Sequence, residues 1–120
     1  SWGHDWDEHG QLFFINSVIG HLWHAVPGAR YRRMYGNHFD KFLYELMPQT
    51  ADHFHWDQGN EHWADLKKKG MTSPTNAAGG GHGHGGRMIY GADNWPEEYR
   101  GQVFTLNLHG RRINRDTLHR

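Results

Sequence analysis

QVFTLNLHG, residues 102–110, is the stretch that decides the fold class. Alternate side chains divide it into two faces: Val103, Thr105, Asn107 and His109 on one, and Phe104, Leu106 and Leu108 on the other. A period of two over such a run is typical of a β-strand. Gly110 and Arg111 then supply a turn, so we expect residues 112–120 to return as an antiparallel strand.

Further short strands are predicted upstream of this hairpin. Residues 11–16, QLFFIN, form an apolar run of strand length. Residues 21–26, HLWHAV, alternate between two faces until Pro27 and Gly28 end the run. Residues 87–90, RMIY, are a third candidate. Short strands separated by glycine turns predict a mainly β protein with antiparallel sheets.

Helical patterns are limited to small insertions. Within residues 38–47 the apolar side chains fall at helical spacing, between the N-cap candidate Asn37 and Pro48, which predicts one or two turns. Pro96 opens a second helical turn over residues 96–101, because proline is favoured at the first helical position.

The remaining segments are predicted from composition. Residues 1–10 are acidic and aromatic, and we expect a loop there. Residues 30–35 are either a strand or a polar excursion, and the polar stretch 57–78 is expected to be a loop insertion. The chain then divides into a blade-like part, 1–36, an insertion, 37–78, and a second blade-like part, 79–120.

Composition excludes several classes of protein. The net charge is zero, with 13 basic and 13 acidic residues, so no overall positive field favours nucleic acid. Without cysteine the chain has no disulfide, thiolate zinc site or thioether-linked haem. No apolar run approaches the length of a membrane span. We find no signal peptide and expect the chain to be a segment of a longer protein.

Three stretches together resemble a known family. They are WGHDWDEHGQLFF (2–14), HLWHAVPGARYRRMYG (21–36) and GGGHGHGGRMIYGADNWPEEYRGQVFTLNLHGRRINR (79–115). They are similar to the β-propeller part of the PVC-type membrane-bound dehydrogenases. The third stretch is similar, more distantly, to soluble quinoprotein dehydrogenases of glucose and sorbosone. The resemblance implies about two blades of a β-propeller.

The resemblance also implies a function for the parent protein. A propeller of this kind would oxidise a sugar or an alcohol at its channel mouth with PQQ and calcium. Its location would be periplasmic, its partners would be the remaining blades and a cytochrome c-like domain, and haem would reside only in that domain. The alternatives are a non-catalytic propeller that binds carbohydrate or a partner, and a histidine-rich metal-binding module, since 12 residues are histidine.

Candidate site residues follow from both arguments. The glycines of GGGHGHGG, 79–86, allow close approach of the backbone to a ligand, and the alternative is a solvated flexible loop. The catalytic candidates are His82, His84 and His109, and the ligand-binding candidates are Tyr90, Arg111, Asn114 and Arg115. His109 could equally anchor its turn, and the arginines could equally form surface ion pairs.

The sequence also offers candidate metal ligands. His82 and His84 project to one face of an extended backbone and could share Zn²⁺ or Cu²⁺, but a closed site needs three or four ligands. Asp5 and Asp7, with Glu8, cluster like calcium ligands, although the twelve-residue calcium-loop pattern is missing. A solvated acidic turn is the alternative.

Overall fold

The computed structural model describes residues 2–17, 21–31, 39, 46–48, 50, 67–70, 72–73, 83–108 and 110–119. In this part of the chain the strands are β1 (Gly3–Trp6), β2 (Leu12–Ile15), β3 (Leu22–His24), β4 (His84–Ile89), β5 (Val103–Asn107) and β6 (Arg112–Asp116). A short 3₁₀ helix, η1 (Glu97–Tyr99), joins β4 to β5. The strands form two three-stranded antiparallel sheets, which confirms the predicted mainly β class.

The first sheet has the order β1-β2-β3. Its middle strand β2 confirms the strand predicted over residues 11–16. The prediction of a loop over residues 1–10 is wrong, because Gly3–Trp6 pairs with β2, with Gly3 opposite Ile15. The acidic composition suggested a solvated loop, but the acidic side chain of this strand binds the neighbouring sheet. Asp5 Oδ2 accepts a hydrogen bond from the Ile89 backbone N–H at 2.8 Å.

The second sheet has the order β4-β5-β6 and confirms the C-terminal hairpin. β5 alternates as predicted, and η1 confirms the helical turn after Pro96. β4 begins at His84, so the end of the glycine tract is strand and not loop. A bulge interrupts the β4–β5 register between Gly85 and Arg87. Gly86 occupies it with φ of 59°, a left-handed conformation that favours glycine.

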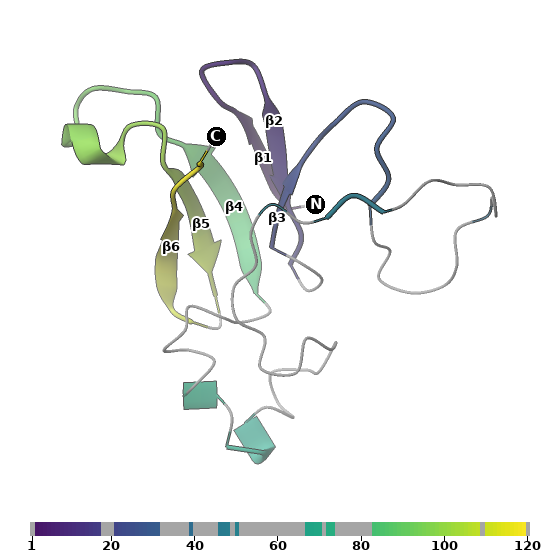
Figure 1. Ribbon diagram of the computed structural model, residues 1–120. Coiled ribbons are helices and arrows are strands. Elements are labelled where there is room, and N and C mark those ends of the chain that lie inside the picture. The colour runs from purple at the N-terminus through teal and green to yellow at the C-terminus, as the bar shows by residue number, and fades with distance from the viewer. Residues whose placement is uncertain are drawn as a thin grey trace.

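The two sheets meet along β1 and β4, which lie side by side in the middle of Figure 1. The Gly86 N–H donates to the Trp2 carbonyl oxygen at 3.0 Å. Gly3 lies so close to β4 that an added Cβ would be 2.9 Å from the Arg87 backbone nitrogen. Backbone contact and the Asp5 hydrogen bond therefore hold this junction, rather than a regular ladder.

The apolar core between the sheets is small. It consists of five buried side chains, Phe13, Ile15, Leu22, Ile89 and Val103, with Leu118 packed against them. β2 and β3 supply one side of this core and β4 and β5 the other. Much of the remaining space between the sheets is therefore filled by polar groups.

Several predictions fall mainly outside the described residues. These are the helical turns over 38–47, the excursion over 30–35, most of the insertion over 57–78, and the first half of the glycine tract. Among the residues that are described, no helix is both long and apolar enough to cross a membrane.

Candidate functional site

The inner face of the second sheet is mostly polar. It carries His84, Arg87, Ile89, Val103, Thr105, Asn107, Arg112, Asn114 and Asp116. The bulge at Gly86 explains how His84 and Arg87, three positions apart, share this face, because one extra residue restores the alternation. Without the bulge, a regular strand would place the guanidinium and the imidazole on opposite faces.

His21 is the centre of this polar layer. Its side chain is fully buried just before β3, and its Nε2 lies 3.2 Å from Asp116 Oδ2 of β6. An ionised carboxylate only accepts hydrogen bonds, so the proton of this bond is on His21 Nε2. The His21 ring also contacts the His84 ring, with centroids 4.3 Å apart and planes tilted by 52°. The histidines and the carboxylate thus form a continuous contact across the two sheets.

Arg87 adds a buried positive charge to the same layer. Its three guanidinium nitrogens are buried without a hydrogen-bond partner, and its Cζ lies 5.2 Å from the centre of the Phe13 ring. Burial lowers the pKa of Arg87 to about 10, while the charges of Asp5 and Asp116 oppose that shift. The carboxylates therefore compensate only in part for the loss of hydration.

A cavity of about 590 Å³ lies at the His84 end of this layer. The described residues that line it are Trp2, Ser17, Gly83, His84, Gly85, Leu106, Asn107, Leu108, Arg111 and Arg112. Ser17 Oγ donates to the His84 carbonyl oxygen at 2.7 Å, which ties the first sheet to the wall of the cavity. His84 therefore stands between the cavity and the His21–Asp116 pair.

The β5–β6 turn shapes the rim of the cavity. Asn107 is buried at the end of β5, and its Oδ1 accepts a hydrogen bond from the Gly110 N–H at 2.8 Å. Arg112 Nε donates to the Gly110 carbonyl oxygen at 3.3 Å. Arg111, between them, has φ of 51°, the one positive value outside glycine among the described residues. Side-chain hydrogen bonds from two strands thus fix a turn that presents adjacent arginines.

The structure separates the predicted ligand-binding residues. Arg111 lines the cavity, and Asn114 is buried in the polar layer. Arg115 is on the outer face, where its Cζ lies 5.2 Å from the centre of the Tyr99 ring. Tyr90 is at the opposite end of the sheet, where its hydroxyl donates to Asn94 Oδ1 and fixes the loop before η1. Tyr90 and Arg115 are therefore not brought together with Arg111.

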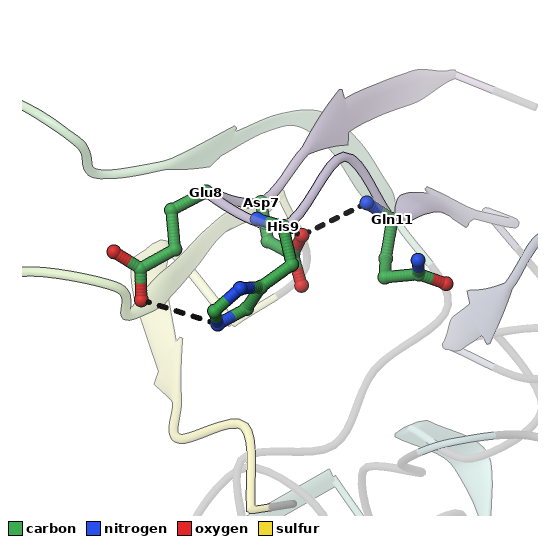
Figure 2. Close-up of polar contacts among 4 residues, drawn as sticks. All are labelled: Asp7, Glu8, His9 and Gln11. Carbon is green, nitrogen blue, oxygen red and sulfur yellow. Dashed lines mark hydrogen bonds and ion pairs between the residues drawn. The ribbon is translucent and has the colours of Figure 1, made fainter.

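Of the predicted catalytic histidines, His84 is part of the polar layer, whereas His82 and His109 lie outside the described residues. The predicted calcium ligands Asp5 and Asp7 are used in hydrogen bonds to the backbone. Asp7 Oδ1 accepts from the N–H groups of His9 and Gln11 and closes the β1–β2 turn (Figure 2). Within the described part of the chain, no three acidic or histidine side chains gather as metal ligands.

Residues important to this site have no clear signal in the sequence. His21, Arg87 and Asp116 were not predicted as site residues. The partner of His21 is 95 positions away, so no local spacing connects the two. The only available signal is that His21 begins the alternating run 21–26, next to a predicted strand.

Comparisons with known proteins give no match. No family model matches this chain, and no curated protein and no solved structure is significantly similar to it. Its function must therefore be argued from the geometry.

Proposed function

We propose that this chain supplies an acid–base site for a small molecule with a hydroxyl group, a sugar or an alcohol, within a larger β-rich protein. The observation that carries this proposal is the position of His84. The residue is 2 % exposed, it lines the cavity, and its ring contacts that of His21, which pairs with Asp116. A histidine backed by a second polar group that a carboxylate orients is a common arrangement for proton transfer.

The roles of the residues follow from their contacts. Asp116 holds the tautomer and orientation of His21 through the Nε2 hydrogen bond. His21 packs against His84 and limits its rotation. A ligand hydroxyl that reaches a ring nitrogen of His84 from the cavity would give it its proton, so that the O–H bond breaks and an N–H bond forms.

Calcium-bound PQQ, which the family resemblance implies, does not fit the described lining. Calcium takes six to eight oxygen ligands, commonly with carboxylates among them. The lining offers the Ser17 hydroxyl, the Asn107 amide and backbone carbonyls, but its described residues include no aspartate or glutamate. We therefore derive no hydride transfer here, and oxidation of a sugar or alcohol by the parent stays a prediction.

The acid–base function is tested by turnover in the longest natural protein that contains this chain. Because oxidation is the reaction predicted for the parent, alcohols and sugars would be assayed with an artificial electron acceptor, comparing wild type with His84→Gln. We expect kcat to fall by about a hundredfold or more, since a general base contributes roughly 10²–10⁴-fold. His4→Gln is the matched control, because His4 is exposed on β1 and does not line the cavity. Equal turnover by wild type and His84→Gln, or no turnover of any substrate in the panel, would refute the proposal.

The second candidate function is binding without catalysis. The apolar side chains of Trp2, Leu106 and Leu108 line the cavity and favour this candidate, because apolar walls are typical of sites that bind small molecules. Isothermal titration that detects a ligand whose affinity is unchanged by His84→Gln, with no turnover, would support this candidate over the first.

We also propose that the two sheets are neighbouring blades of a propeller. The support is the outer face of β4–β6, where Met88 and Ile113 are 37 and 63 % exposed. Stacked blades cover both faces of an inner sheet, so a further blade would bury these side chains. Analytical ultracentrifugation tests this: the chain alone should self-associate as its concentration rises, and a concentration-independent monomer would contradict it.

A further inference from the structure

We infer that the cavity binds a small organic carboxylate with an apolar body, and that Arg111 selects the carboxylate. This inference rests on the proposed function for the choice of cavity, and it narrows the ligand from any sugar or alcohol to a hydroxyl-bearing molecule that also carries a carboxylate on an apolar body. It follows from the walls of the cavity, the charges at its rim and the backbone conformation of Arg111.

The walls fit an apolar body. Trp2, Leu106 and Leu108 line the cavity and are each more than half exposed, so they present apolar surface that water covers in the free protein. A volume of about 590 Å³ is within the range of sites that enclose a drug-sized molecule. Displacing water from such surface favours binding of an apolar group.

The charges at the rim fit an anion. Arg111 and Arg112 are adjacent in the β5–β6 turn, and no acidic residue is among the described residues of the lining. A guanidinium presents a planar set of donors that matches the two oxygens of a carboxylate. Arg112 is held by its bond to the Gly110 carbonyl oxygen. The side chain of Arg111 is exposed and makes no hydrogen bond or ion pair with any described residue.

The backbone of Arg111 is the independent observation. Its φ of 51° lies in the left-handed region, which glycine or asparagine adopts at lower cost than arginine. Turn geometry alone therefore favours a different residue at this position. An arginine here strains the backbone and adds a charge that the described fold does not use, which is typical of a residue retained for a ligand.

The test is isothermal titration of the natural protein at low salt with three probes that share one apolar body: naphthoate, naphthylmethanol and naphthylmethylammonium. We expect naphthoate to bind about tenfold or more tightly than naphthylmethanol, since a charge-assisted contact is much stronger than a neutral one. The ammonium probe should bind most weakly. Acetate at millimolar concentration should not displace naphthoate, because it lacks the apolar body.

Substitutions separate a ligand-binding role of Arg111 from a structural one. Arg111→Gly should abolish the preference for naphthoate while raising Tm, because glycine relieves the backbone strain. Arg111→Lys should keep part of the preference. Arg115→Gln is the matched control on the outer face of β6 and should leave the preference unchanged. A lower Tm for Arg111→Gly together with an unchanged probe preference would overturn the assignment.

The outcomes also distinguish this inference from the proposed function. If His84→Gln leaves turnover unchanged but naphthoate still binds more tightly than naphthylmethanol, the acid–base function fails and the ligand class stands. If the two probes bind equally, or if neither binds, the inference is overturned whatever the turnover assay shows.

Discussion

Replacement of Thr105 by valine is expected to stabilise the protein, although it alters a buried position in the central strand of a sheet. Thr105 is 1 % exposed on the inner face of β5, between Arg87 of β4 and Asn114 of β6. Its Oγ1 is buried without a hydrogen-bond partner. A buried hydroxyl that lacks a partner costs about 1–3 kcal/mol in protein mutational data.

The expected gain follows from the shape of the two side chains. Valine has the same branched outline and places a methyl group where threonine has its hydroxyl, and both residues favour strands. Taking the lower part of the range, because the neighbouring side chains are themselves polar, we expect about 1 kcal/mol more free energy of unfolding. For a domain of this size that corresponds to a rise in Tm of roughly 4 °C.

Urea unfolding followed by tryptophan fluorescence measures this change. Thr105→Ser is the control, because it keeps the hydroxyl, removes a buried methyl group and should lose about 0.8 kcal/mol. If Thr105→Val instead loses about 1 kcal/mol or more, the hydroxyl has a partner in the folded protein, and the reasoning is wrong.

The remaining predictions concern the junction of the sheets. Gly3→Ala should lose about 1–3 kcal/mol because its Cβ would lie 2.9 Å from the Arg87 backbone nitrogen, whereas Gly91→Ala, with nothing within 4 Å, should change thermal stability little. Burial lowers the folded pKa of Arg87 to about 10, below the ordinary value for arginine, so the unfolded chain holds this proton at higher pH. The stability of wild type relative to Arg87→Met should therefore rise as the pH passes above about 10, and an unchanged difference in urea midpoints would contradict this. Asp7→Ala should lose about 1–2 kcal/mol in thermal unfolding, because the N–H groups of His9 and Gln11 lose their acceptor.

The sequence was informative about the strands and less so about their faces. The alternation in residues 102–110 predicted β5 and its two faces correctly. Hydropathy would bury Phe104, Leu106 and Leu108, yet the buried positions of β5 are Val103, Thr105 and Asn107. Which face is buried depends on what packs against the strand, here the first sheet. The alternation within the strand does not indicate which face that sheet will cover.

The glycine tract shows a second limit. Its glycines predicted a loop near a ligand, whereas its last residues form the start of β4 with a bulge at Gly86. The bulge depends on pairing with β5 and therefore cannot be inferred from the tract itself. The same holds for the site, because the His21–Asp116 contact joins residues from both sheets. His84 could be predicted as a candidate residue, but its backing by His21 could not.

Three positions of the second sheet break ordinary rules of stability within a short distance along the strands. Arg87 buries its guanidinium nitrogens without hydrogen bonds, Thr105 buries a hydroxyl likewise, and Arg111 has a left-handed backbone. Folded proteins retain such features mainly where function requires them, so these three positions support a site toward the His84 end of this sheet rather than at its Tyr90 end. The double variant Thr105→Val, Arg111→Gly tests whether the buried hydroxyl and the left-handed backbone lower stability independently. Its gain in stability should equal the sum of the gains of the two single variants if the sites act independently, while its loss of naphthoate preference should equal that of Arg111→Gly alone. Thr105→Val alone should keep the naphthoate preference; a loss in that single variant would mean that Thr105 also contributes to the ligand site and that its buried hydroxyl is functional.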